Sequence, residues 1–268
     1  MPSSTPAQSP RSADGEPPVD RDTVVGKVVT ILRAFTVDDS DLPLAELVRR
    51  TGLHKATVHR LAGELVGVRL LDRTDRGYRL SGGLFELGML ASVERSLLEI
   101  AMPFLQDLYG RTRETVHLGV LDGHEVVYVA KIGGHRQASA PSRTGGRMPL
   151  HCTGIGKALL AHADPSLRHT VLASPLARRT PRTIIAPGIL ARQLDTIRES
   201  GVAYEYEESA PGIGCVAAPI LDVATNAVVA AVSVTGPLTR YRPDAQADAV
   251  RAAATGIAST LDRRRALR

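Results

Sequence analysis

The chain has 268 residues, 43% of them hydrophobic and 23% charged, so it is long enough for two modest domains with ordinary cores. The formal net charge of +5 fits a nucleic-acid partner without requiring one. The two cysteines, Cys152 and Cys215, are too few for a disulfide scaffold. The sequence has neither an apolar run of about 20 residues nor a signal-peptide core, so we expect a cytoplasmic protein with no membrane partner.

Residues 1–20 are rich in proline, serine and small residues, and they contain almost no bulky apolar side chain. Such a segment cannot bury enough surface to offset the entropy that it would lose on ordering. We therefore expect a disordered tail over residues 1–20.

Residues 21–81 have the pattern of three short helices followed by a hairpin. Apolar residues recur at helical spacing over 22–37, over 44–51 and over 55–65. Two strand-like pieces over 70–80 then flank a turn that contains glycine. This element order predicts a winged helix-turn-helix domain, which places one helix in the major groove of DNA.

The third helix carries small and basic residues on the face opposite its apolar side chains. Val58, Leu61 and Leu65 form the apolar face. The other positions supply hydroxyl, methyl, imidazole and cationic groups, which suit phosphates and base edges. The predicted DNA contacts are Lys55, Thr57, His59 and Arg60 on this helix, and Arg73 and Arg76 on the hairpin.

Positive charge is concentrated in this part of the chain. Residues 49–79 contain eight basic and three acidic side chains, whereas the wider stretch 20–100 is close to neutral. Attraction to phosphates requires such clustering. The alternative is a solvated basic helix in a protein-binding adaptor, because winged helices also bind proteins.

Two helical stretches follow the hairpin. Residues 82–95 are apolar on more than one face, which predicts a linker helix that packs between domains or at a dimer interface. A new helix is expected from Ser96 to Arg111, with Pro103 kinking or restarting it.

Residues 96–268 alternate strands and helices, and they are expected to form the second domain. Asp122 and Gly123 predict a hairpin between strands at 115–121 and 125–132. The other predicted elements are helices at 153–163 and 187–200, strands at 201–206, 213–221 and 227–235, and a terminal helix at 244–264. Many hairpin-joined strands predict an α/β domain with a mostly antiparallel sheet, so the fold class of the whole chain is α+β.

The glycine-rich turn at residues 153–157 is not a nucleotide-binding loop. A P-loop requires glycine where His151 stands and serine or threonine where Ala158 stands, and the dinucleotide fingerprint requires glycine where Leu159 stands. A glycine-rich turn that opens a helix still offers backbone N–H groups to a carboxylate. Tight packing is the alternative explanation.

Cys215 lies within an apolar strand pattern, where a buried cysteine is usually inert. We expect it to line a pocket or pack in the core; a Cys-dependent hydrolase would need a base that the sequence does not identify. His151 and Cys152 are adjacent on an extended segment, so they point to opposite faces and do not suit one metal ion. We expect no catalytic residue, no metal and no cofactor.

Several separate motifs resemble the IclR family of bacterial transcriptional regulators. The resemblance covers residues 22–265 in the family's order. The matching segments are LAELVRRTGLHKATVHRL at 44–61, YRL at 78–80, RETVHL at 113–118, EVVYV at 125–129, LHCTGIGKALL at 150–160 and PGIGCVAAP at 211–219.

This resemblance implies a GAF-like effector-binding domain, a homodimer or dimer of dimers, and a roughly palindromic double-stranded DNA operator. It implies a small organic or aromatic acid as effector. The family's effector contacts fall here on Gly154, Ile155, Glu205, Cys215, Ser233 and Thr235. Glu205 and Thr235 are bulkier than the family's usual residues, and His54 stands where the family often has proline. The effector's identity, the operator, and repression or activation stay open.

Overall fold

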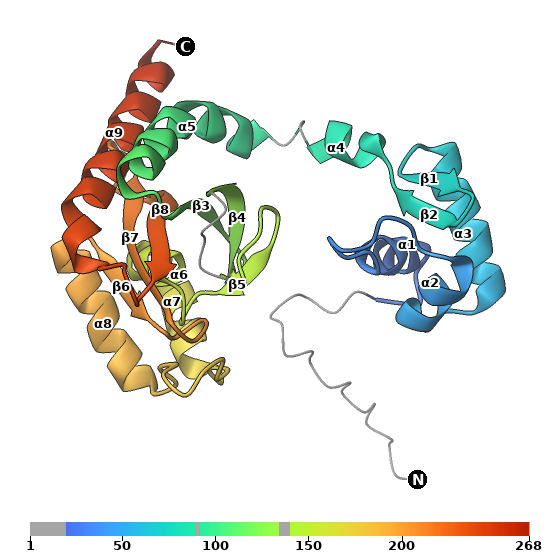
Figure 1. Ribbon diagram of the computed structural model, residues 1–268, viewed down its shortest axis with the longest axis horizontal. Coiled ribbons are helices and arrows are strands. Elements are labelled where there is room, and N and C mark those ends of the chain that lie inside the picture. Colours follow the sequence, from blue (N-terminus) through green and yellow to red (C-terminus); the bar gives the residue numbers. More distant parts are fainter. Residues whose placement is uncertain (1–19, 89, 91, 134–139, 268) are drawn as a thin grey trace, which may run out of the picture. The chain divides into compact units, whose positions relative to one another are not determined.

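The computed structural model describes residues 20–267 except 89, 91 and 134–139 (Figure 1). Of the tail predicted over residues 1–20, only Asp20 belongs to the described part. The chain forms two compact units, one ending at Arg95 and the other beginning at Ser96. None of the helices in the described ranges combines the length and the apolar character that a bilayer crossing requires.

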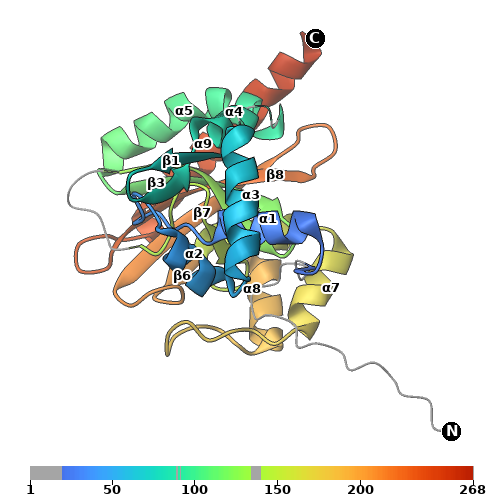
Figure 2. The same cartoon turned by 90° about the vertical axis from the view of Figure 1, so that its right-hand side faces the viewer.

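The first unit is a winged helix-turn-helix, as predicted. It consists of α1 (Val24–Arg33), α2 (Leu44–Thr51), α3 (Lys55–Gly67) and the hairpin of β1 (Leu71–Thr74) and β2 (Gly77–Leu80). Figure 2 shows α3 along its length. Its core contains one or more residues from each helix and each strand: Ile31, Leu47, Val58, Leu61, Leu71 and Tyr78.

Helix α1 is shorter than the predicted stretch 22–37. It begins at Val24 because Thr23 is the N-cap, with its Oγ1 accepting a hydrogen bond from Gly26 N at 3.0 Å. It ends at Arg33, since Thr36 donates two hydrogen bonds of 2.7 Å to Asp39 in a local turn that competes with the helix.

The helices after the hairpin are divided differently from the prediction. Helix α4 covers Gly82–Gly88, and α5 runs from Ser92 to Thr112 across the predicted start at Ser96 and through Pro103. Proline removes only one backbone donor. The buried face of α5 continues on both sides of it, and packing of this face outweighs the loss; its members are Leu97, Ile100, Ala101, Leu105 and Leu108.

The second unit contains a six-stranded sheet in which every pairing is antiparallel. The order is β5-β4-β3-β8-β7-β6. The strands are β3 (Thr115–Asp122), β4 (Glu125–Ile132), β5 (Arg147–Pro149), β6 (Ala203–Tyr206), β7 (Ile213–Leu221) and β8 (Val228–Pro237). The predicted antiparallel sheet is confirmed; β5 has only three residues, too few to show a period.

Helices cover both faces of this sheet (Figure 1). On one face lie α5 and the terminal helix α9 (Ala247–Ala266). On the other lie α6 (Gly154–His162), α7 (Pro165–Ala173) and α8 (Pro187–Ser200). Alternate residues of each strand therefore belong to different cores: Val216 faces α5 and α9, whereas Ala217 faces α6. Helix α7 was not predicted.

Gly77 is the first residue of β2 in the β1–β2 hairpin, which forms the wing, and it packs closely against the backbone of Leu42. Its φ is +145°, and a Cβ there would lie 2.1 Å from the Leu42 carbonyl oxygen. Gly77→Ala should therefore destabilise the first unit by about 2 kcal/mol or more. Hydrogen exchange of α2 and α3 amides in the full chain measures this loss.

Gly63→Ala is the matched control, because Gly63 lies in α3 and its Cβ position is open. It should stabilise the helix by about 0.5–1 kcal/mol. Equal exchange rates in Gly77→Ala and in the unsubstituted chain would contradict the prediction.

Candidate nucleic-acid interface and ligand pocket

The predicted contact residues of α3 lie on its outer face. Lys55, His59 and Arg60 are exposed and Thr57 is half-buried, while Val58 and Leu61 are fully buried. The helix begins at Lys55 after His54, whose side chain makes no capping hydrogen bond. Burial of the apolar face thus presents hydroxyl, imidazole and cationic groups together on the solvent side.

The wing is fixed to the body of the first unit by a backbone bridge. Leu42 N donates to Tyr78 O at 2.7 Å, and Tyr78 N donates to Leu42 O at 2.9 Å. Arg73 lies against the Tyr78 ring, 5.2 Å from its centroid, and donates to the hydroxyl at 2.8 Å. Arg76 lies exposed at the turn. Buried Tyr78 therefore orients one of the two predicted wing contacts.

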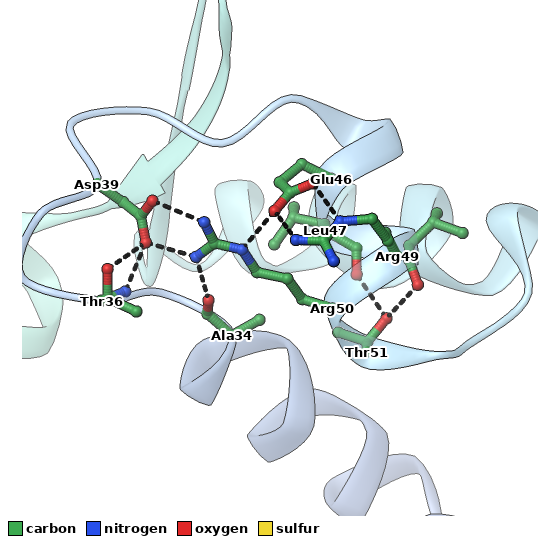
Figure 3. A network of polar contacts seen from close by, with 9 residues as sticks. Ala34, Thr36, Asp39, Glu46, Leu47, Arg49, Arg50 and Thr51 are labelled. Carbon is green, nitrogen blue, oxygen red and sulfur yellow. Dashed lines mark hydrogen bonds and ion pairs between the residues drawn. The ribbon is translucent and has the colours of Figure 1, made fainter.

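Arg50 connects three segments of the first unit (Figure 3). Its guanidinium donates to Ala34 O at 2.9 Å, to both oxygens of Asp39 at 2.6 and 2.9 Å, and to Glu46 at 2.7 Å. The hydrogen bonds from Arg50 and then from Thr36 hold the pKa of Asp39 well below its usual range. Arg50 is thus a structural link between α2 and the segment after α1.

Much of the positive charge counted in the sequence is paired. Five of the eight basic residues of 49–79 form ion pairs with carboxylates: Arg49, Arg50, Arg60, Arg69 and Arg79. Arg60 Nη1 lies 2.5 Å from Glu64 on the next turn of α3. Lys55 and Arg76 have no ion-pair partner among the described residues. These two cations can therefore bind a phosphate without first breaking an ion pair with a described residue.

Strand register brings distant polar residues together in the second unit. Thr115 pairs with Thr235, Thr235 with Cys215, and Cys215 with Glu205, across four neighbouring strands. Side chains at paired positions share one face of the sheet. The row lies on the face covered by α6, because Ala217, two residues from Cys215, packs in the core of that side.

A cavity opens at this row, next to the start of α6. Its described lining residues are His117, Tyr128, Ala140, Pro141, Ser142, Met148, Thr153, Gly154, Glu205, Ser209, Ile213, Cys215 and Thr235. Four of the six residues predicted to bind an effector are among them. Ser233 lies nearby, with its Oγ 3.5 Å from His117 Nδ1. The Ile155 side chain packs in the apolar core, so only its backbone can serve a ligand. Their effector contacts remain predictions.

The start of α6 approaches strand β7 closely. Thr153 caps the helix by accepting a hydrogen bond from Gly156 N at 3.0 Å. A Cβ at Gly154 would lie 2.7 Å from Cys215 Sγ, so glycine allows the helix end to reach the cavity wall. The N–H groups of Gly154 and Ile155, which come before Gly156 in the first turn, have no partner within the helix and can bind an anion.

Glu205 is buried at the other end of the row. Its Oε1 accepts hydrogen bonds from Glu208 N at 2.6 Å, Ser209 N at 2.9 Å and Ser209 Oγ at 3.3 Å. Burial outweighs these bonds and raises the pKa of Glu205 to about 7. This carboxyl therefore changes charge near neutral pH.

His117 also lines the cavity, although it is not among the residues predicted to contact the effector. Its Nε2 lies 2.7 Å from Ser142 Oγ, and its ring meets Tyr128 edge-on at 5.1 Å. Burial, helped by Lys131, lowers the pKa of His117 to about 3, so the ring is neutral. Its position in an alternating strand was the available signal, and the sequence could not show that the inward face borders a cavity.

The cysteines have the environment of inert thiols. Burial raises the pKa of both Cys152 and Cys215 to about 12. His151 Nε2 lies 2.9 Å from Ala177 O. Within the described ranges, no three histidine, cysteine or acidic side chains are grouped as metal ligands.

A buried ion pair connects two elements that border the cavity. Lys157 of α6 is fully buried and lies 2.5 Å from Glu208, and it also donates to Gln193 of α8 at 3.2 Å. Thr183 Oγ1 donates to Glu208 O at 2.7 Å. The pair therefore ties α6 to the loop whose N–H groups hold Glu205, a connection that sequence motifs did not reveal.

Comparison with known proteins gives matches to both units. A family model described as the IclR helix-turn-helix domain matches residues 24–75. A second, described as bacterial transcriptional regulator IclR C-terminal, matches residues 89–262.

Relatives resemble the chain over most of its length. The regulator BhcR of Paracoccus denitrificans is 37% identical over 79% of this chain and 77% of its own. KdgR of Dickeya chrysanthemi is 34% identical over 87% and 76%. The crystal structure of an IclR homolog from Microbacterium hydrocarbonoxydans, complexed with 4-hydroxybenzoate, has a TM-score of 0.83 and 32% identity, covering 89% of this chain and 99% of that one.

Arg50→Met should loosen the first unit although Arg50 is not on α3. The substitution keeps an unbranched apolar stem but lacks the guanidinium, so it removes the hydrogen bonds to Ala34, Asp39 and Glu46. Hydrogen exchange of α2 should become faster and DNA affinity should fall. Arg49→Met is the control, because Glu46 is the one ion-pair partner of Arg49 among the described residues and the Arg49 side chain is 72% exposed. Similar effects of both substitutions would refute the linking role.

Lys157→Met should destabilise the second unit by about 3–5 kcal/mol, because it leaves Glu208 buried without its cation. The double variant Lys157→Met with Glu208→Leu should recover most of the lost stability, because neither charge of the pair then remains buried. Hydrogen exchange of β6–β8 amides in the full chain measures both effects. A double variant no more stable than Lys157→Met would contradict this account.

Proposed function

The chain belongs to the IclR family of bacterial transcriptional regulators, and we propose that it contacts a roughly palindromic operator through α3 and the wing, under control of a small carboxylic acid. It is a DNA-binding transcriptional regulator controlled by a small-molecule effector. Such a regulator acts on the bacterial chromosome, so we place it in the cytoplasm.

The single observation that carries the DNA-contact proposal is the outer face of α3. Lys55, His59 and Arg60 are exposed over a buried apolar face. We assign Thr57 to base edges through its hydroxyl and methyl groups, and Lys55 and Arg60 to phosphates or guanine edges. Arg73 and Arg76 extend the contact from the wing.

The second unit supplies the effector site in this proposal. A relative was crystallised with 4-hydroxybenzoate, which supports a small aromatic acid as the ligand class. We assign binding to the cavity lined by Gly154, Glu205, Cys215 and Thr235, with further contacts from the Ile155 backbone and from Ser233 nearby. In a homodimer or dimer of dimers, the effector would favour one relative placement of the DNA-binding units by binding that arrangement better.

The two other functions considered are less well supported. A Cys215-dependent hydrolase requires a thiolate, whereas burial raises the pKa of Cys215 to about 12. A protein-binding adaptor does not need a face of α3 that exposes several cations. We therefore propose no enzymatic activity.

Lys55→Ala and Arg60→Ala should each weaken operator binding about tenfold, as loss of one phosphate or base contact does. The operator is first obtained by selection from genomic fragments, and affinity is titrated at several salt concentrations. Loss of a phosphate contact lowers the slope of log affinity against log salt by about one.

Arg251→Ala is the control, because Arg251 lies on α9 and pairs with Asp248. It should leave the affinity and the salt slope unchanged. If Lys55→Ala and Arg60→Ala match this control at every salt concentration, the assignment of α3 is wrong.

A further inference from the structure

The ligand cavity combines a buried acid with a helix start that favours anions. Glu205 is 1% exposed and lines the cavity. Its hydrogen bonds all reach Oε1, and Oε2 accepts none from the described residues. The described lining contains no lysine or arginine. A ligand at Oε2 therefore meets a carboxyl group whose other oxygen is already occupied.

The opposite wall favours negative charge. Gly154 at the start of α6 borders the cavity, and Thr153 takes the N–H of Gly156, leaving those of Gly154 and Ile155 for a ligand. Gly154 lies against Cys215, the strand partner of Glu205. The start of α6 and Glu205 therefore both adjoin Cys215, and both border the same cavity.

We propose that an acidic effector binds with uptake of one proton, which is shared between its carboxylate and Oε2 of Glu205. The ligand anion, ionised Glu205 and one proton from solvent give a hydrogen-bonded carboxyl–carboxylate pair with a net charge of −1. Two adjacent carboxylates in a buried site cannot both stay ionised. This inference rests on the proposed effector class and adds proton-coupled recognition to it.

The other titratable groups around Glu205 have surroundings of their own. Burial raises the pKa of Glu208, while Lys157, 2.5 Å away, opposes this rise by stabilising the carboxylate. Cys152 and Cys215 have pKa values of about 12, and burial raises the pKa of Tyr128. His117 is neutral, with a pKa of about 3 set by burial and by Lys131.

The pKa of Glu205, about 7, sets the expected pH dependence. Below it the carboxyl is protonated and ready to donate; above it each ligand anion must bring a proton. Affinity for an acid should thus fall about tenfold from pH 6 to pH 8. A neutral amide of the same shape binds without proton uptake, because ionised Glu205 can accept a hydrogen bond from the amide N–H.

The test is calorimetric titration of the full chain with 4-hydroxybenzoate, benzoate and butyrate and with their amides, from pH 6 to pH 8. Titration in buffers of different ionisation enthalpy measures proton uptake directly in the unsubstituted protein. We expect close to one proton per bound acid at pH 8 and none per amide.

Glu205→Gln is the decisive variant, because the Gln oxygen can keep the three hydrogen bonds of Oε1 and its N–H₂ can donate at any pH. It should bind the acid independently of pH and about tenfold more tightly than the unsubstituted chain at pH 8. Glu207→Gln is the control, since Glu207 pairs with Arg182 and does not line the cavity. It should keep the pH dependence.

Acid binding without proton uptake, or pH dependence that persists in Glu205→Gln, overturns the inference while leaving the proposed regulator intact. Binding of amides but of no acid overturns both the inference and the acidic effector class. If no probe binds at pH 6 in protein that still binds its operator, the inference fails and DNA recognition stands.

Discussion

The ligand cavity depends on the pairing of β7 with β6 and β8. This register aligns Glu205, Cys215 and Thr235 on one face. A shift of one residue in β7 would send Cys215 into the core beneath α5 and α9 and bring Val216 to the cavity. The register is stabilised by Val216, Ala218 and Ile220, whose burial on the far face requires this alternation.

Buried charge then determines the shape of the cavity wall. The Lys157–Glu208 pair joins α6 to the loop after β6, and backbone N–H groups of that loop hold Glu205 Oε1. The arrangement keeps an acid buried, and burial favours its protonated form. The same contacts that organise the fold thus set the chemistry available to a ligand.

The DNA-binding unit uses charge differently. Arg50 and Asp39 connect α2 with the segment after α1, and the Leu42–Tyr78 bridge connects that segment with the wing. Backbone and side-chain bonds therefore position the wing relative to α3 before any DNA is bound. Preorganised contacts of this kind lower the entropy lost on binding.

The sequence alone determined most of the elements and their faces, because helical and strand periodicities are local. It identified α2, β7 and α8 at their observed bounds and α3 up to two residues before its end, and its motifs identified the family. Only the tertiary structure decided which polar residues meet: His117 and Lys157 gained their roles from strands and loops far away in the chain. It also decided that Arg50 is paired while Lys55 has no ion-pair partner among the described residues, since pairing depends on distance in space rather than on charge counted along the sequence.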